Sequence, residues 1–160
     1  MKKLLLCTLI FSLHSNLIAK KIYCQFEEVY QNGETQQGQI LLFDEKLRYE
    51  YFDENLFTLL FVNENLFQIE NKKPHRTKLV NNYPIINDLF LIYSKFPDIK
   101  KSYKQDGYEI LVDKHSSFFI KRLAVKSKQL NLSIHFLECE EKIIQKKYFN
   151  FNPFIDYVPS

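Results

Sequence analysis

The sequence contains only three glycines and a single methionine in 160 residues. It has no glycine-rich loop that could cradle a phosphate group and no nucleophile elbow. Its histidines at positions 75, 115 and 135 lie far apart and form no ligand-spaced pair, so we expect neither a metal site nor a cofactor. Lysine and arginine form no dense block, and binding to nucleic acid therefore has no electrostatic basis. These absences argue against an enzyme and against a nucleic-acid-binding protein.

Acidic residues give no clear catalytic pair either. Glu27 and Glu28 are adjacent, as are Glu140 and Glu141, but neighbours in a strand point to opposite faces of a sheet. A hydrolase would need a nucleophile and a base that the sequence does not reveal, and it is the weakest of the functional hypotheses.

The first nineteen residues have the pattern of a secretory signal peptide. Lys2 and Lys3 precede an apolar run from Leu4 to Leu13, and Ala19 provides a small residue at the expected cleavage site. The alternative is a transmembrane anchor, but the run is shorter than the roughly 20 residues that cross a bilayer. We therefore expect a signal peptide over residues 1–19, export to the periplasm, and a mature domain of residues 20–160. Without Lys2 and Lys3 the charge balance is 20 basic against 19 acidic residues, a net charge of +1.

Two cysteines lie in the expected mature chain. Cys24 and Cys139 have no local spacing that would indicate a metal site. Because disulfides persist in exported proteins, the pair could be bonded. Two free thiols buried in strands are the alternative, and the sequence does not decide between them.

Most of the chain alternates between short apolar runs and turns rich in Asn, Asp, Glu and Lys. This spacing, together with the strong turn signal of Asn32-Gly33, is typical of a meandering antiparallel sheet. We expect strands over residues 22–31, 35–43, 47–52, 56–62, 66–70, 75–80, 99–104, 108–113, 118–126, 129–138 and 143–146.

One helix interrupts this pattern. Leu89, Ile92, Tyr93 and Phe96 follow the spacing of a single helix face, with Asn87 or Asp88 as the expected N-cap, and Pro97 ends the segment. No linker or repeat divides the chain, so a single domain is expected.

Several expected strands are apolar on both faces. Residues 40–43, 56–62 and 118–120 contain almost no polar side chain, whereas a sheet with one wet face alternates apolar and polar residues. The helix can cover one face. The other face needs further cover, and the 15 Phe and 10 Tyr residues could build either a filled core or the wall of an apolar cavity.

The order of motifs resembles the LolA family, the periplasmic carriers of lipoproteins to the outer membrane. The resemblance covers residues 22–158 and ends on a Phe-x-Phe-x-Pro tail, its most distinctive part. The matching segments are Phe26 and residues 38–43 (GQILLF), 47–51 (LRYEY), 83–85 (YPI), 120–123 (IKRL), 132–136 (LSIHF) and 149–153 (FNFNP).

This resemblance implies a mainly β fold: a curved antiparallel sheet, or incomplete β-barrel, covered by one or more helices. It also implies an apolar cavity for lipoprotein acyl chains, an inner-membrane ABC transporter that delivers them and an outer-membrane acceptor. The chain departs from the family in two places. The helix that usually precedes the first strand has no counterpart here, and Asp44-Glu45 stand where many carriers have a basic residue followed by proline.

The leading hypothesis is accordingly a monomeric periplasmic carrier that binds acyl chains reversibly and without chemistry. The second is a periplasmic protein-interaction or sensor module whose cavity is filled by its own side chains. For the carrier, the expected acyl-binding residues are apolar ones of the central strands and the helix, although the sequence does not say which strand face points inward. They are Tyr49, Tyr51, Phe57, Leu59, Phe61, Leu89, Ile134 and Phe136.

Overall fold

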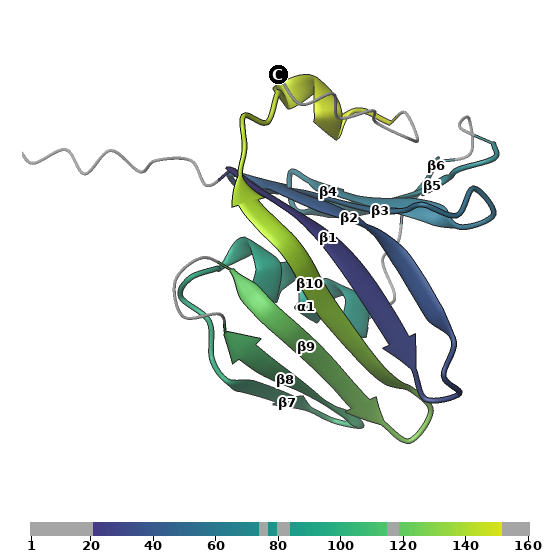
Figure 1. Ribbon diagram of the computed structural model, residues 1–160, viewed down its shortest axis with the longest axis vertical. Helices are drawn as coiled ribbons and strands as arrows, with labels where there is room; N and C mark the ends of the chain where they lie inside the picture. The colour runs from purple at the N-terminus through teal and green to yellow at the C-terminus, as the bar shows by residue number, and fades with distance from the viewer. Residues whose placement is uncertain (1–20, 74–76, 80–83, 115–118, 152–160) are drawn as a thin grey trace, which may run out of the picture.

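The computed structural model describes residues 21–73, 77–79, 84–114 and 119–151, and the expected signal peptide lies outside this part of the chain. Within these ranges, ten strands form one antiparallel sheet, with β6 and β7 at its two ends (Figure 1). The mainly β prediction is therefore confirmed. The strands are β1 (Lys21–Tyr30), β2 (Thr35–Phe43), β3 (Lys46–Tyr51), β4 (Phe57–Val62), β5 (Asn65–Glu70), β6 (Thr77–Leu79), β7 (Ser102–Gln105), β8 (Tyr108–Lys114), β9 (Ile120–Ser127) and β10 (Asn131–Glu141).

Each half of the sheet is a meander, and the two halves meet where β1 pairs with β10 in the sheet order β6-β5-β4-β3-β2-β1-β10-β9-β8-β7. The first hairpin turns at Gly33, whose φ of 84° suits glycine, as the Asn32-Gly33 signal predicted. Gly38 in β2 is required for another reason. A Cβ there would collide with the ring of Phe26, its register partner on β1, and with the carbonyl oxygen of Glu50 on β3.

Cys24 and Cys139 form a disulfide across the junction of the two halves, with Cα atoms 4.1 Å apart. The register of β1 against β10 shifts between Tyr23 and Gln25, and Glu138 beside the bond has a φ of 48°. This irregularity is a β-bulge, which places two residues of β10 opposite one residue of β1. The alternative of two free thiols does not hold in this structure.

The helix α1 (Pro84–Ser94) lies against the concave face of the curved sheet (Figure 1). Its predicted apolar face is confirmed, because Leu89, Ile92 and Tyr93 are buried. The predicted N-cap is wrong: Asn87 and Asp88 lie inside the helix, which begins at Pro84. Proline is favourable in the first turn because its missing N–H has no helical partner there. No helix in the described ranges is long and apolar enough to cross a membrane.

Two separate cores explain why the strands are apolar on both faces. The larger core lies between the concave face and α1, and it contains Phe26, Tyr49 and Leu59. The smaller core lies on the opposite, convex face of the sheet. It consists of Leu41, Leu60, Ile69, Ile144 and Phe149.

Ile144 and Phe149 come from the segment after β10, where a strand over residues 143–146 was expected. That expectation is wrong: the segment leaves the sheet and forms the 3-10 helix η1 (Lys146–Phe149). Arg48, fully buried on the convex face, donates from Nη1 to the carbonyl oxygens of Tyr148 (3.4 Å) and Asn150 (3.2 Å), and from Nε to Glu50 (2.6 Å). By leaving the sheet, this segment covers Leu41, Leu60 and Ile69 and removes their apolar surface from water.

Candidate binding cavity

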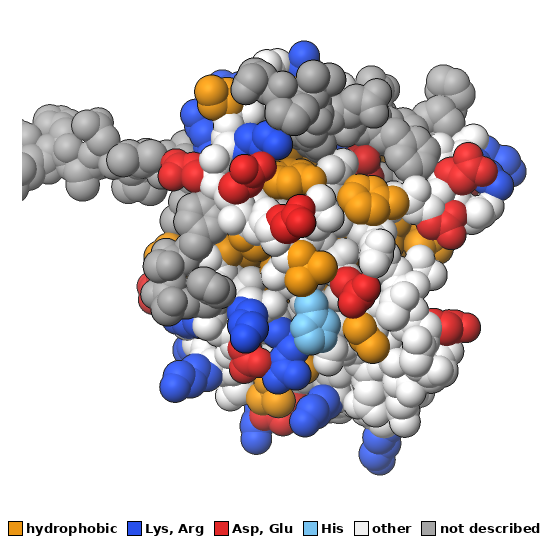
Figure 2. Space-filling model, viewed as in Figure 1, with side chains coloured by type: hydrophobic (Ala, Val, Ile, Leu, Met, Phe, Trp, Pro, Cys, Tyr) orange, Lys and Arg blue, Asp and Glu red, His pale blue; other side chains and the backbone are white. Residues whose placement is uncertain are grey.

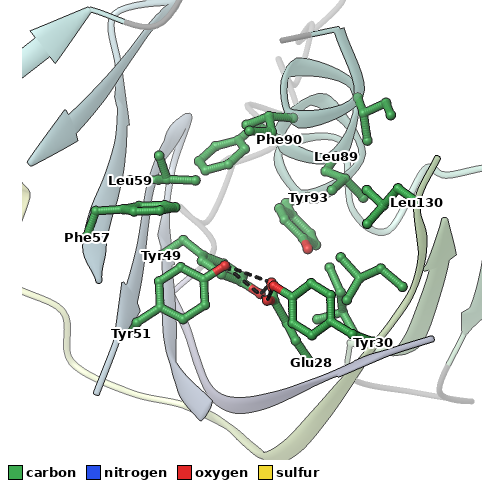
Figure 3. A pocket seen from close by; sticks show the side chains of 14 residues that line it. Glu28, Tyr30, Tyr49, Tyr51, Phe57, Leu59, Leu89, Phe90, Tyr93 and Leu130 are labelled. Carbon is green, nitrogen blue, oxygen red and sulfur yellow. Dashed lines mark hydrogen bonds between the residues drawn. The ribbon is translucent and has the colours of Figure 1, made fainter. Parts of the chain in front are cut away.

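A cavity of about 220 Å³ lies between α1 and the concave face of the sheet (Figure 3). Strands β1, β3, β4 and β10 supply one side of it, and α1 supplies the other. Its walls are apolar or aromatic apart from one carboxylate and a few tyrosine hydroxyls. The lining residues are Glu28, Tyr30, Tyr49, Tyr51, Phe57, Leu59, Ile85, Ile86, Leu89, Phe90, Tyr93, Leu130, Leu132 and Ile134.

Six of the eight residues expected to bind acyl chains line this cavity. Leu59 alternates along β4 with Thr58 and Leu60, which are buried on the convex side, so the structure decides the face that the sequence left open. The six are Tyr49, Tyr51, Phe57, Leu59, Leu89 and Ile134.

Phe61 and Phe136 belong to the same core but do not line the cavity. The ring of Phe61 lies 6.0 Å from that of Phe90, beyond the cavity wall, and borders a second pocket with Leu91 and Lys95. The ring of Phe136 packs edge-on against Tyr93 and Phe119, with centroids at 5.6 and 5.4 Å. Both residues lie on the concave face of the sheet, as the cavity does, but they are too far along their strands to reach the cavity.

One end of the cavity is polar because Glu28 lies there, only 3% exposed. Three tyrosine hydroxyls donate to its carboxylate (Figure 3). Tyr30 donates to Oε2 at 2.6 Å and Tyr49 to Oε1 at 2.7 Å, while Tyr51 lies 3.0 Å from both oxygens. An ionised carboxylate only accepts hydrogen bonds, so three donors on two oxygens suit a charged Glu28.

The tyrosines around Glu28 are held in their neutral form. Burial raises the pKa of Tyr49 and Tyr51 well above the usual value of 10, and the negative charge of Glu28 raises it further. Burial also raises the pKa of Tyr30, and its hydrogen bond to Glu28 adds to the effect. The three side chains therefore remain O–H donors at neutral pH.

Tyr93 contributes a hydroxyl that has no hydrogen-bond partner among the described residues. The side chain is 1% exposed, and Figure 3 shows its oxygen pointing into the space above Glu28. A buried polar group without a partner costs about 1–3 kcal/mol. The arrangement therefore leaves one donor and acceptor available to a molecule in the cavity.

The cavity is bordered by half-buried residues, which mark the side from which a ligand could enter. These residues come from the end of β1, from β4, from α1, and from β10 and the turn before it; they are Tyr30, Phe57, Ile85, Ile86, Leu130 and Leu132. The volume of about 220 Å³ is below the roughly 300–1,000 Å³ of typical small-molecule sites. As it stands, the cavity has room for a slender apolar group.

The alternation of β1 carries the signal for Glu28. Its buried side chains are Ile22, Cys24, Phe26 and Glu28, so a carboxylate continues an otherwise apolar face. The sequence interpretation placed Glu27 and Glu28 on opposite faces, which the structure confirms, but it did not recognise Glu28 as part of a site. It also missed Tyr30, Ile85, Ile86, Phe90, Tyr93, Leu130 and Leu132.

The cavity offers apolar walls, hydroxyl groups and one carboxylate, which is the chemistry of a site that binds an amphipathic molecule. The described residues contain no group of three or more His, Cys, Asp and Glu side chains that could hold a metal ion.

On the surface seen in Figure 2, acidic and basic side chains both occur, with hydrophobic ones scattered between them. No protein-family model matches the chain, and a search among curated proteins finds no match.

Proposed function

We propose that the protein is a periplasmic carrier that binds an acyl or other alkyl chain in the cavity between α1 and the sheet. The observation that carries the proposal is the cavity itself, which is walled by six of the residues expected to bind acyl chains. Its chemistry is burial of apolar surface, and the protein acts without catalysing a reaction.

The energetics suit reversible binding. Each methylene group removed from water contributes ~0.8 kcal/mol, so ten of them contribute ~8 kcal/mol before any cost. Association of two molecules costs about 4 kcal/mol or more in lost freedom of motion. The remainder corresponds to modest affinity, which allows a carrier to release its cargo to an acceptor.

The disulfide and the resemblance to the LolA family support the same function. The Cys24–Cys139 disulfide is compatible with an oxidising compartment. The open, curved sheet with a helix on its concave side is compatible with the incomplete barrel of that family. On this proposal an inner-membrane ABC transporter loads the carrier with lipoprotein acyl chains and an outer-membrane acceptor receives them.

The size of the cavity sets a condition on the mechanism. An apolar cavity of about 150 Å³ holds a molecule the size of benzene, so about 220 Å³ admits only a short stretch of alkyl chain. Complete acyl chains require α1 to move away from β4 and β10. Side-chain packing holds α1 to the sheet, whereas each central strand is hydrogen-bonded to a neighbouring strand on both sides.

The same small volume favours a second candidate, a protein-interaction or sensor module with no lipid cargo. Such a module would keep the cavity nearly filled by its own side chains. The two functions differ in whether the purified protein retains an alkyl-chain molecule.

A pair of matched variants on β10 tests the proposal. Leu132→Trp fills the cavity from its half-buried edge, whereas Leu137→Trp adds the same side chain at a position on the same strand that is 45% exposed and does not line the cavity. Ile86→Trp provides a second filling variant on α1. Each protein is purified from the periplasm, checked by thermal unfolding, and its retained lipids are identified by mass spectrometry.

We expect alkyl-chain molecules with the wild type and with Leu137→Trp, and their loss with Leu132→Trp and Ile86→Trp. A wild-type protein that retains no such molecule and takes up none in solution would support the interaction module. Equal retention by all four proteins would place the lipid outside this cavity.

A further inference from the structure

The polar end of the cavity holds a negative charge that no described neighbour neutralises. Among the described lining residues there is no lysine, arginine or histidine, and the three partners of Glu28 are neutral hydroxyl groups. Buried charges in proteins are paired or bind a cation as a rule. Hydroxyl donors solvate the carboxylate but leave its charge in place.

Aromatic rings surround the same end. Tyr49, Tyr51 and Phe57 come from neighbouring strands, and the ring of Tyr51 meets that of Phe57 edge-on with centroids 5.2 Å apart. Figure 3 shows Tyr30 and Tyr93 on the other side of the carboxylate. Faces of aromatic rings attract cations, and ammonium groups are recognised in sites built from several such rings.

The unpartnered hydroxyl of Tyr93 is an independent sign that a ligand group belongs here. It is buried, it points into the space between the rings, and within the described residues nothing satisfies it. A polar head at this end of the cavity could bind the Tyr93 hydroxyl and lie beside the Glu28 carboxylate. The rest of the ligand would then lie along the apolar walls formed by Leu59, Leu89 and Ile134.

We propose that the cavity selects an alkyl chain that ends in an ammonium group, with Glu28 as the counter-ion and the tyrosine rings as the walls around the cation. This inference rests on the proposed function, since it names the chemical class of the molecule that the carrier binds. The chain occupies the apolar part of the cavity and the ammonium group occupies the polar end. A carboxylate head at the same place would face the charge of Glu28 and is disfavoured.

A series of ligands with the same ten-carbon chain tests the selection. Decylamine and decyltrimethylammonium carry the cation, decanol is neutral and decanoate is anionic. Their affinities for the full-length mature protein are measured by isothermal titration calorimetry below their micelle-forming concentrations. We expect the two cations to bind at least about tenfold more tightly than decanol, the size expected for a desolvated cation among aromatic rings, and decanoate to bind most weakly.

Two variants of neighbouring residues on β1 locate the effect. Glu28→Gln removes the charge and keeps an amide oxygen for the tyrosine hydroxyls, so the cations should bind within about threefold of decanol. Glu27→Gln is the matched control, because Glu27 lies on the opposite face of the sheet, where Gln37 donates to it at 3.0 Å. The Glu27→Gln variant should prefer cations as strongly as the wild type does. Thermal unfolding shows whether each variant is folded. The comparison of the four ligands on the wild-type protein does not depend on either variant.

The outcomes separate this inference from the proposed function. Decanol or decanoate binding as tightly as decylamine would overturn the cationic selection and leave the carrier in place. Unchanged preference in Glu28→Gln would overturn the role of Glu28. Binding of none of the four ligands would overturn both proposals.

A last pair of probes distinguishes the source of the ammonium group. Lysophosphatidylethanolamine carries its amine beside a phosphate, and an S-alkylated cysteine peptide carries a free amino terminus without one. If either probe binds more tightly than decanol, the proposal is supported and the tighter probe identifies the source. If both bind more weakly than decanol, the proposal is opposed.

Discussion

Breaking the Cys24–Cys139 bond should remove a large part of the stability of the fold. The bond closes a loop of 115 residues. This loop contains strands β2 to β9, which lie between β1 and β10 along the chain. In the chain-entropy model, a loop of this length restricts the unfolded chain by ~4.8 kcal/mol at 25 °C. Single domains unfold with about 5–15 kcal/mol, so the loss is comparable to the total stability of a modest domain.

Chemical reduction is the cleanest perturbation because it leaves both sulfur atoms in place. Urea unfolding of the same protein, followed by circular dichroism with and without a reducing agent, gives the difference in unfolding free energy. We expect a decrease of about 3–5 kcal/mol, and a similar decrease in the Cys24→Ala/Cys139→Ala double variant with an additional cost for the buried Cys24 side chain. An assay of free thiols on the reduced protein is the control, because it shows whether reduction of the disulfide is complete.

The result that refutes this reasoning is an unfolding free energy that changes by less than about 1 kcal/mol after complete reduction. Pairing of β1 with β10 would then by itself hold the two halves of the sheet together, and the cross-link would add little to it.

Three further changes have definite expected results. Tyr93→Phe removes an unpartnered hydroxyl and should raise the unfolding free energy by about 1–3 kcal/mol, measured by urea unfolding; a decrease would show that the hydroxyl has a partner. Gly38→Ala places a methyl group against the Phe26 ring and a backbone oxygen and should lower it by about 1–3 kcal/mol, whereas an unchanged value would show that the sheet relaxes at no cost. Tyr49 and Tyr51 have folded-state pKa values above the unfolded value near 10, so the folded state holds their protons more tightly. Their contribution to the unfolding free energy is therefore fully present below about pH 10 and is lost as the pH rises above it. Absorbance at 295 nm should report these tyrosinates only as the protein unfolds, and their ionisation in the folded protein would contradict the burial.

The sequence predicts much of the fold because its turn and alternation signals are local. Asn32-Gly33 indicates the first hairpin, and the range 35–43 expected for the second strand is that of β2. The two apolar faces of β4 predict two layers of cover, and the structure has two cores. What could not be predicted depends on contacts between distant residues. Leaving the sheet after β10 lets Phe149 cover Leu41, an advantage that no local pattern encodes.

The site was predictable in part for the same reason. Alternation identified Tyr49, Tyr51, Phe57 and Leu59 as a set, but only the position of α1 decides that this set faces the cavity. Glu28 was the residue that a closer reading could have found, because it continues the buried face of β1. Of the tyrosines that surround it, Tyr30 stands two residues later on β1. Tyr49 and Tyr51 come from β3, which β2 separates from β1, so no sequence spacing indicates their contact with Glu28.

The central claim is that an alkyl chain binds between α1 and the concave face of the sheet. Isotope-filtered NMR on the labelled protein with unlabelled decanol measures contacts between the methylene protons of the ligand and individual side chains. We predict contacts with the rings of Tyr49 and Phe57 and with the methyl groups of Leu132, and none with Leu137 or Ile143, which are exposed outside the cavity. Contacts confined to Leu137 and Ile143, or no contacts at a saturating concentration of decanol, would contradict the account.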